Sequence, residues 1–228
     1  MDRYKGKRVS ILGDSISTYA GFIPETHRPR YPQDNLVTDV NNTWWMKVIN
    51  LLEATLGVND SWAGSTVSNH RDFNEKDFGP DAAMASYTRI RNLGSNGIPD
   101  LIFFFGGTND AGKMVEKGSI DNAFSPDPES YKWNSFADAY REALARLREL
   151  YPNAGIIAMT PSFSNGCYDN ERLSEFADLI IEICRRENIK CVDLRKSGIT
   201  FDMLPDGLHP NADGMDRIYR AVINILEK

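Results

Sequence analysis

The chain has 228 residues, of which 41 % are hydrophobic and 25 % are charged, and it carries a net charge of −6 at pH 7. This balance is typical of a globular protein, and the length predicts a single domain, residues 1–228, with a sizeable hydrophobic core. The acidic charge disfavours nucleic acid and anionic membranes as partners, because both select clustered lysine and arginine side chains.

The N-terminal segment MDRYKGKR lacks the apolar stretch of a signal peptide, and no apolar run reaches the roughly eighteen residues of a transmembrane helix. We therefore expect a cytoplasmic location and no membrane insertion, or a periplasmic or secreted location if a signal peptide has been removed. The cysteines, Cys167, Cys184 and Cys191, are odd in number and include no C-x-x-C pair. This pattern argues against a disulfide framework and against a zinc site.

Five apolar runs have the length of a β-strand: residues 8–12, 58–62, 101–105, 154–159 and 190–194. Most of them are continuous rather than alternating, which is typical of parallel strands that are covered on both faces.

Helical periodicity is present between these strands, in residues 45–56, 80–93, 136–150, 173–184 and 215–225. Thr43 is the expected N-cap of the first helix, and Gly57 is its expected stop. Strands that alternate with helices predict right-handed βαβ units and a doubly wound sheet, whose ligands bind at the carboxyl ends of the strands. Two long polar stretches, residues 19–42 and 111–134, are expected to be functional loops.

Polar and glycine-rich segments follow each predicted strand: GDS (13–15), WAGST (62–66), GGTND (106–110), TPS (160–162) and, after the last strand, DGLHP (206–210). Parallel strands bring these segments to one edge of the sheet. A hydroxyl group, a backbone glycine, a side-chain amide and an Asp/His pair are therefore expected at one site.

Ser15 has two interpretations at the end of the first strand. It can cap a helix, or it can act as a nucleophile that uses the free N–H groups of the helix start and needs a base. Among the three histidines, His209 is the best candidate base, because Asp206 precedes it by three residues and can orient its ring. His27 and His70 are expected mainly at the surface, and His70 is also a candidate ligand contact.

Gly64 and Asn109 can complete an oxyanion hole. The backbone N–H groups of Ser15 and Gly64 and the side-chain amide of Asn109 would bind the negative charge that forms when an ester carbonyl is attacked. A tight turn at Gly64 and an Asx-turn at Asn109 are the alternative interpretations.

Taken together, the segments around Ser15, Gly64, Asn109 and His209 resemble the four sequence blocks of the SGNH, or GDSL-type, hydrolases, in the family's order and over nearly the whole chain. The resemblance implies a three-layer α/β/α sandwich with a five-stranded parallel sheet of flavodoxin-like strand order, and an esterase that needs no metal and no organic cofactor. Ile16 stands where the family usually has leucine.

The resemblance also implies a role for each residue. Ser15 would be the nucleophile, His209 the general base and then acid, and Asp206 its orienting partner, while Ser15, Gly64 and Asn109 would form the oxyanion hole. The Gly-x-Ser-x-Gly elbow of the α/β-hydrolases is absent from the sequence, which disfavours that other class of serine esterase.

The expected substrate is a small-molecule or carbohydrate ester with a short acyl group such as acetyl. Lysophospholipids and thioesters are the alternatives within the family. Asp14, His70, Trp44 and Phe163 are candidate substrate contacts. Asp14 can equally serve as a structural hydrogen-bonding residue in the turn, and one of Trp44 and Trp45 can be a core residue of the helix that follows.

Two hypotheses from other classes stay open. The sheet edge could be a non-catalytic module that binds a sugar or a nucleotide, although no phosphate-binding glycine motif follows a predicted strand. Alternatively, Asp14, Asp206 and His209 could hold a metal for phosphoester hydrolysis.

Overall fold

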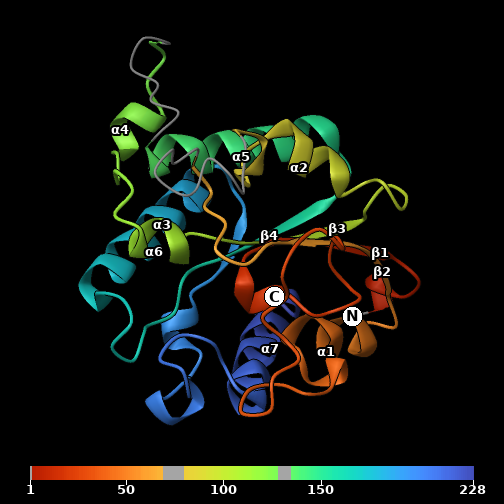
Figure 1. Ribbon diagram of the computed structural model, residues 1–228. Coiled ribbons are helices and arrows are strands. Elements are labelled where there is room, and N and C mark those ends of the chain that lie inside the picture. Colours follow the sequence, from red (N-terminus) through yellow and green to blue (C-terminus); the bar gives the residue numbers. More distant parts are fainter. Residues whose placement is uncertain (1, 69–79, 128–134) are drawn as a thin grey trace.

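The computed structural model of the protein describes residues 2–68, 80–127 and 135–228 (Figure 1). Its strands are β1 (Arg8–Gly13), β2 (Thr55–Ser61), β3 (Leu101–Phe105), β4 (Gly155–Met159) and β5 (Lys190–Val192). All neighbouring strands are parallel, and their order is β2-β1-β3-β4-β5. This is the flavodoxin-like order of a doubly wound sheet, so the predicted fold class is confirmed.

The α-helices of the described residues are α1 (Trp44–Leu51), α2 (Tyr87–Asn92), α3 (Thr108–Gly112), α4 (Ile120–Ala123), α5 (Phe136–Leu150), α6 (Asn170–Arg186) and α7 (Ala212–Leu226). The helices α1 and α7 contact each other on one face of the sheet, and α2, α5 and α6 lie on the other face (Figure 1). No helix in residues 2–68, 80–127 or 135–228 is long and apolar enough to cross a membrane.

Alternate residues of the central strands supply two separate hydrophobic cores. Phe103 of β3 packs toward α1 and α7, whereas its neighbours Ile102 and Phe104 pack toward α5 and α6. All three side chains are fully buried. The central strands are therefore apolar on both faces, which explains why their sequence shows a continuous apolar run.

The first helix is shorter than its apolar stripe predicts. Thr43 caps its N-terminus as expected, but the helix ends at Leu51 because Glu53 adopts a left-handed backbone conformation with φ of 48°. The N–H of Ala54 then bonds back to the carbonyl oxygen of Ile49 at 3.0 Å, which closes the helix end. Leu56, assigned above to the helix, lies in β2 opposite Val9.

The predicted helix over residues 80–93 is divided into two short elements. A single 3₁₀ turn spans Pro80–Ala82, and α2 begins only after Ser86, whose side chain accepts a hydrogen bond from the N–H of Arg89. Ser86 is a favourable N-cap, and it starts a new helix here instead of continuing the first one.

A buried ion pair holds the ends of β1 and β2 together. The guanidinium group of Arg89 is fully buried, and its Nε donates to Oδ2 of Asp60 at 2.7 Å. Its Nη2 also donates to the carbonyl oxygen of Gly13 at 3.2 Å. Arg89 therefore fixes Gly13, the last residue of β1, directly before the segment that carries Ser15.

Candidate active site

The carboxyl edge of the sheet brings Ser15 and His209 together, although 194 residues separate them in the sequence. The Oγ of Ser15 lies 2.8 Å from Nε2 of His209. On the other side of the ring, Nδ1 of His209 lies 2.8 Å from Oδ2 of Asp206. A hydroxyl group, an imidazole and a carboxylate thus form one continuous chain, which is the arrangement that activates a serine nucleophile.

Ser15 is placed by a short turn that Asp14 caps. The residues Ser15–Ser17 form a single 3₁₀ turn, and Oδ1 of Asp14 accepts a hydrogen bond from the N–H of Ile16 at 3.0 Å. The cap is therefore Asp14 and not Ser15, whose hydroxyl group is directed toward His209 instead. The expected α-helix start is only one turn long here, so its dipole is much weaker than that of a full helix.

Asp14 is fully buried directly after β1. Burial raises the pKa of Asp14 to about 7, although the hydrogen bond from Ile16 lowers it. The burial and the capping bond favour the structural role that was the alternative to a substrate contact.

Asp206 is held by the turn in which it lies. Its Oδ1 accepts the backbone N–H groups of Leu208 at 3.0 Å and of His209 at 2.7 Å. Burial raises the pKa of Asp206, but these two N–H groups and the nearby imidazole outweigh burial and bring the pKa to about 2. The carboxylate is therefore ionised at neutral pH and can orient the imidazole and stabilise its protonated form.

The imidazole of His209 is neutral at neutral pH. Burial lowers its pKa below the usual 6.5, even though the charge of Asp206 raises it. A neutral imidazole whose Nδ1–H bonds to a carboxylate presents the lone pair of Nε2 to the serine hydroxyl group. The protonation state of His209 and its contact with Ser15 are thus both suited to proton transfer from the hydroxyl group.

The loop before η3 (Val40–Asn42) packs against the turn of Asp206 and His209. Arg30 forms an ion pair with Oδ2 of Asp206, the same oxygen atom that faces the imidazole. Tyr31 is fully buried, donates its hydroxyl group to the carbonyl oxygen of Pro210 at 3.0 Å, and places its ring edge-on to His209. Neither contact could be predicted from the sequence, because a polar loop gives no periodic signal of where it packs.

Gly64 lies in the loop after β2, and Asn109 lies in the first turn of α3, at the same edge of the sheet. Gly64 has a φ of 79°, a conformation that favours glycine. The Nδ2 of Asn109 donates one hydrogen to the carbonyl oxygen of Ser65 at 3.0 Å, and the hydroxyl group of Ser65 contacts the carbonyl oxygen of Gly13. These contacts hold the Gly64 loop against both α3 and the segment that carries Ser15.

Asp110 anchors the loop after Gly64. Its fully buried carboxylate accepts the N–H of Val67 at 2.8 Å, and the N–H and hydroxyl group of Ser68 at 3.1 Å and 2.8 Å. Asp110 belongs to the GGTND segment, but the sequence alone does not indicate this role. The three bonds show why a carboxylate follows Asn109.

The remaining predicted substrate contacts have different outcomes. Trp44 is a core residue, because its side chain is fully buried against Phe103 and its Nε1 donates to Ser17; the prediction of a substrate contact was wrong. Phe163 is half-buried, with its ring 5.2 Å from that of Phe201. His70 lies outside the described residues.

His27 is more constrained than a surface loop residue. Its ring stacks on Trp62 at a centroid distance of 3.8 Å, and the guanidinium group of Arg89 lies over the same indole at 4.1 Å. Trp62 is followed directly by the loop that carries Gly64, so the stack holds the start of this loop. Nothing in the sequence pattern connected His27 with Trp62.

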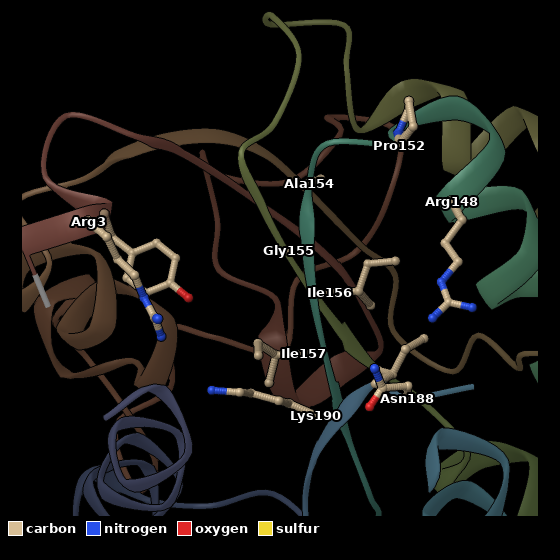
Figure 2. A pocket seen from close by; sticks show the side chains of 11 residues that line it. Arg3, Arg148, Pro152, Ala154, Gly155, Ile156, Ile157, Asn188 and Lys190 are labelled. Carbon is tan, nitrogen blue, oxygen red and sulfur yellow. The ribbon is translucent and has the colours of Figure 1, made fainter. Parts of the chain in front are cut away.

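A cleft of about 590 Å³ lies at the other end of the sheet, beside the first residues of β4 and β5 (Figure 2). Figure 2 shows Arg3, Arg148 and Lys190 around it. Each of these cations donates to a backbone carbonyl group at or just after the C-terminal end of a helix: Leu226, Glu187 and Ile225, respectively. The cleft is separate from the Ser15 site, and its cations stabilise helix ends.

The candidate metal ligands are engaged with other groups. Asp14 faces the N–H of Ile16, and Asp206 faces Arg30 and His209. Within the described ranges, no group of three or more His, Cys, Asp or Glu residues is arranged to hold a metal ion. A cation such as Arg30 beside Asp206 disfavours a metal at the same carboxylate.

The doubly wound sheet, with a serine, a histidine and an aspartate in contact at its carboxyl edge, has the arrangement that is known from hydrolases with a serine nucleophile. The model of the GDSL-like Lipase/Acylhydrolase family matches residues 7–226. The chain therefore belongs to the GDSL-like lipase/acylhydrolase family, whose activity is carboxylic ester hydrolysis.

Solved structures agree with this assignment. A protein from Bacteroides uniformis assigned as a GDSL-like lipase is 32 % identical, with coverage of 97 % of this chain and 95 % of that chain and a TM-score of 0.76. Another from Bacteroides ovatus is 30 % identical, with coverage of 97 % and 98 % and a TM-score of 0.73. The acetylxylan esterase Axe2 of Geobacillus stearothermophilus shares the fold at 19 % identity, with coverage of 100 % and 97 % and a TM-score of 0.63. None of the curated proteins matches the chain.

Proposed function

We propose that the protein hydrolyses short-chain carboxylic esters, with an acetyl group on a carbohydrate as the candidate substrate, through Ser15, His209 and Asp206. The observation that carries the proposal is the chain of two 2.8 Å contacts from the hydroxyl group of Ser15 through the imidazole of His209 to the carboxylate of Asp206. Both outer groups are fixed by backbone hydrogen bonds of their own turns, so the geometry is preorganised.

The reaction would proceed in two halves. His209 takes the proton of the Ser15 hydroxyl group at Nε2 while Oγ attacks the ester carbonyl carbon. The oxyanion that forms is bound by the N–H groups of Ser15 and Gly64 and by the second hydrogen of Asn109 Nδ2. The intermediate collapses, the alcohol leaves with the proton from His209, and an acyl group stays on Ser15.

Water then completes the cycle. His209 accepts a proton from a water molecule, which attacks the acyl carbon, and the carboxylic acid leaves as the proton returns to Oγ of Ser15. Asp206 keeps its negative charge throughout and stabilises the imidazolium that forms in each half. Its pKa of about 2 supports this role, because the carboxylate does not compete for the proton.

Two observations support a small acyl group on a polar alcohol. One is a charged side chain at the triad, Arg30, which forms an ion pair with Asp206, while the stack of His27 on Trp62 directly precedes the loop that carries Gly64. In addition, Axe2, which shares the fold over the full chain, is an acetylxylan esterase. Sugar hydroxyl groups can form hydrogen bonds with polar side chains such as Arg30, whereas a long alkyl chain cannot.

The test compares the wild-type protein with Ser15→Ala on p-nitrophenyl acetate, butyrate and octanoate, and on acetylated xylo-oligosaccharides. We expect kcat/KM to fall as the acyl chain lengthens, and Ser15→Ala to lose at least about 10³-fold. Ser95→Ala, which changes an exposed serine far from the triad, serves as the control. Equal rates for wild type and Ser15→Ala would overturn the proposed nucleophile, and a preference for octanoate would overturn the proposed substrate class.

A further inference from the structure

Lys113 lies against the loop that carries Gly64. It follows the last residue of α3, the helix that carries Asn109, and its Nζ donates a hydrogen bond to the carbonyl oxygen of Gly64. A Cβ atom added to Gly64 would lie 3.7 Å from the same Nζ. The ammonium group therefore sits beside the glycine whose N–H, in the proposed function, binds the oxyanion.

The ammonium group of Lys113 is partly buried, yet it is still protonated at pH 7. Burial lowers the pKa of Lys113 to about 8, while the carboxylates of Asp110 and Asp14 raise it. Each of these carboxylates already accepts backbone hydrogen bonds from the loops around the site. A cation in such surroundings is protonated at pH 7 and acts through a low local dielectric, where charge–charge interactions are stronger than in water.

The neighbouring elements fix the backbone of Lys113. The ring of Tyr168, before α6, packs so closely on Gly112 that a Cβ there would come within 2.4 Å of it. Arg172 of α6 donates its Nε to the carbonyl oxygen of Ala111 at 2.9 Å. The end of α3 is thus held on α6, so the direction from which Lys113 reaches Gly64 is set by the fold.

We propose that Lys113 is a positioning residue of the oxyanion hole: its ammonium group holds the Gly64 peptide in place and stabilises the negative charge that forms on the attacked carbonyl. The inference rests on the proposed function and extends it to a residue outside the four sequence blocks. Gly64, at a φ of 79°, has no side chain to restrain it, so a charge-assisted bond to its carbonyl group is an effective restraint. Lys113 keeps its proton throughout the reaction.

The test measures kcat and KM between pH 6 and pH 10 for wild type, Lys113→Gln and Lys113→Arg, by titration of the acetate released from a soluble acetyl ester. Lys113→Gln can still donate a hydrogen bond but has no charge. Lys113→Arg keeps a charge that does not titrate in this range. Lys117→Gln removes an exposed lysine four residues away, which pairs with Glu175, and is the matched control.

We expect kcat of the wild type to fall as the pH rises through about 8, where Lys113 loses its proton. Lys113→Gln should lose roughly tenfold to hundredfold in kcat at pH 7, less than the loss of a direct oxyanion donor, with KM changed by less than about threefold. The alkaline fall should disappear in both Lys113 variants, while Lys113→Arg should keep most of the activity at pH 7. Lys117→Gln should match the wild type.

Two results would overturn the inference. One is a Lys113→Gln variant with wild-type kcat and the same alkaline fall. The other is an equal loss in Lys113→Gln and Lys113→Arg with the alkaline fall still present, which would mean that the lysine only fills space. The proposed function is judged separately: if Ser15→Ala abolishes hydrolysis while Lys113→Gln does not alter it, only the role of Lys113 fails. The pH profile of the wild type needs no variant to fold.

Discussion

Asn109 provides the sharpest quantitative test of the proposed oxyanion hole. Its Nδ2 carries two hydrogens, and one of them is donated to the carbonyl oxygen of Ser65 at 3.0 Å. The side chain is almost fully buried, at 4 % exposure, so water cannot replace it without a rearrangement. In the proposed mechanism, Asn109→Ala therefore removes a donor to the reacting oxygen, and it also removes the hydrogen bond that holds the Gly64 loop.

The two losses affect different quantities. Removing one oxyanion donor costs about 10²–10³-fold in kcat, which is roughly 2.7–4 kcal/mol of transition-state stabilisation. Leaving the carbonyl group of Ser65 without its partner should lower the free energy of unfolding by about 1–3 kcal/mol. KM should change by less than about threefold, because the donor acts mainly on the charge that exists only in the transition state.

The assay combines steady-state hydrolysis of p-nitrophenyl acetate with urea denaturation of the same preparations. Asn109→Asp tests the sign of the interaction: it keeps the shape but faces the oxyanion with an acceptor, so its kcat should be at least as low as that of the alanine variant. Asn96→Ala removes an exposed amide that donates to Gly57 and should leave kcat unchanged. A loss in kcat below about fivefold for Asn109→Ala, or a loss confined to KM, would refute the role of this amide.

Three further predictions concern carboxylates and the charge around them. Asp206→Asn should lose about 10⁴-fold in kcat, because the amide favours the wrong imidazole tautomer; stopped-flow or steady-state rates within tenfold of wild type would contradict this. The acid limb of kcat/KM should lie below pH 6.5, because burial lowers the pKa of His209. Arg30→Ala should move this limb to higher pH, because the charge of Arg30 also lowers the pKa of His209. An acid limb that does not move would show that Arg30 does not act on the imidazole. Burial raises the pKa of Asp14 from 3.8 to about 7, so its contribution to stability is present below pH 3.8 and is lost as the pH rises to about 7. Asp14→Asn should therefore raise the urea midpoint at pH 8, and a lower midpoint there would mean that the charged carboxylate stabilises the fold.

Much of the fold could be predicted because buried parallel strands leave a clear pattern. The run over β3 is apolar at every position, and both faces of that strand are buried. The start of β2 could not be located, because Leu56 fits the stripe of the preceding helix as well as a strand. The helix ends before Leu56 because Glu53 adopts a left-handed conformation, and the hydrophobic pattern does not indicate this conformation.

The residues of the candidate site also include some that the sequence could predict and some that it could not. Ser15, Asn109 and His209 could be selected because each follows a strand or lies in a short turn beside an acid. Arg30 and Lys113 could not, because their contacts with Asp206 and Gly64 depend on the path of a loop and on the packing of a short helix. Trp44 was misjudged for a related reason: two adjacent tryptophans at a helix start do not show which of them faces solvent, and both are buried.

The decisive test of the proposed mechanism is the identification of the residue that carries the acyl group. The protein is mixed with p-nitrophenyl acetate, quenched in acid during the first turnovers, digested and sequenced by mass spectrometry, with His209→Ala as a variant in which the serine is not activated. We predict an acetyl group on Ser15 in the wild type and a much lower yield in His209→Ala. An acetyl group on another residue, or turnover without any acetylated serine, would contradict the proposed mechanism.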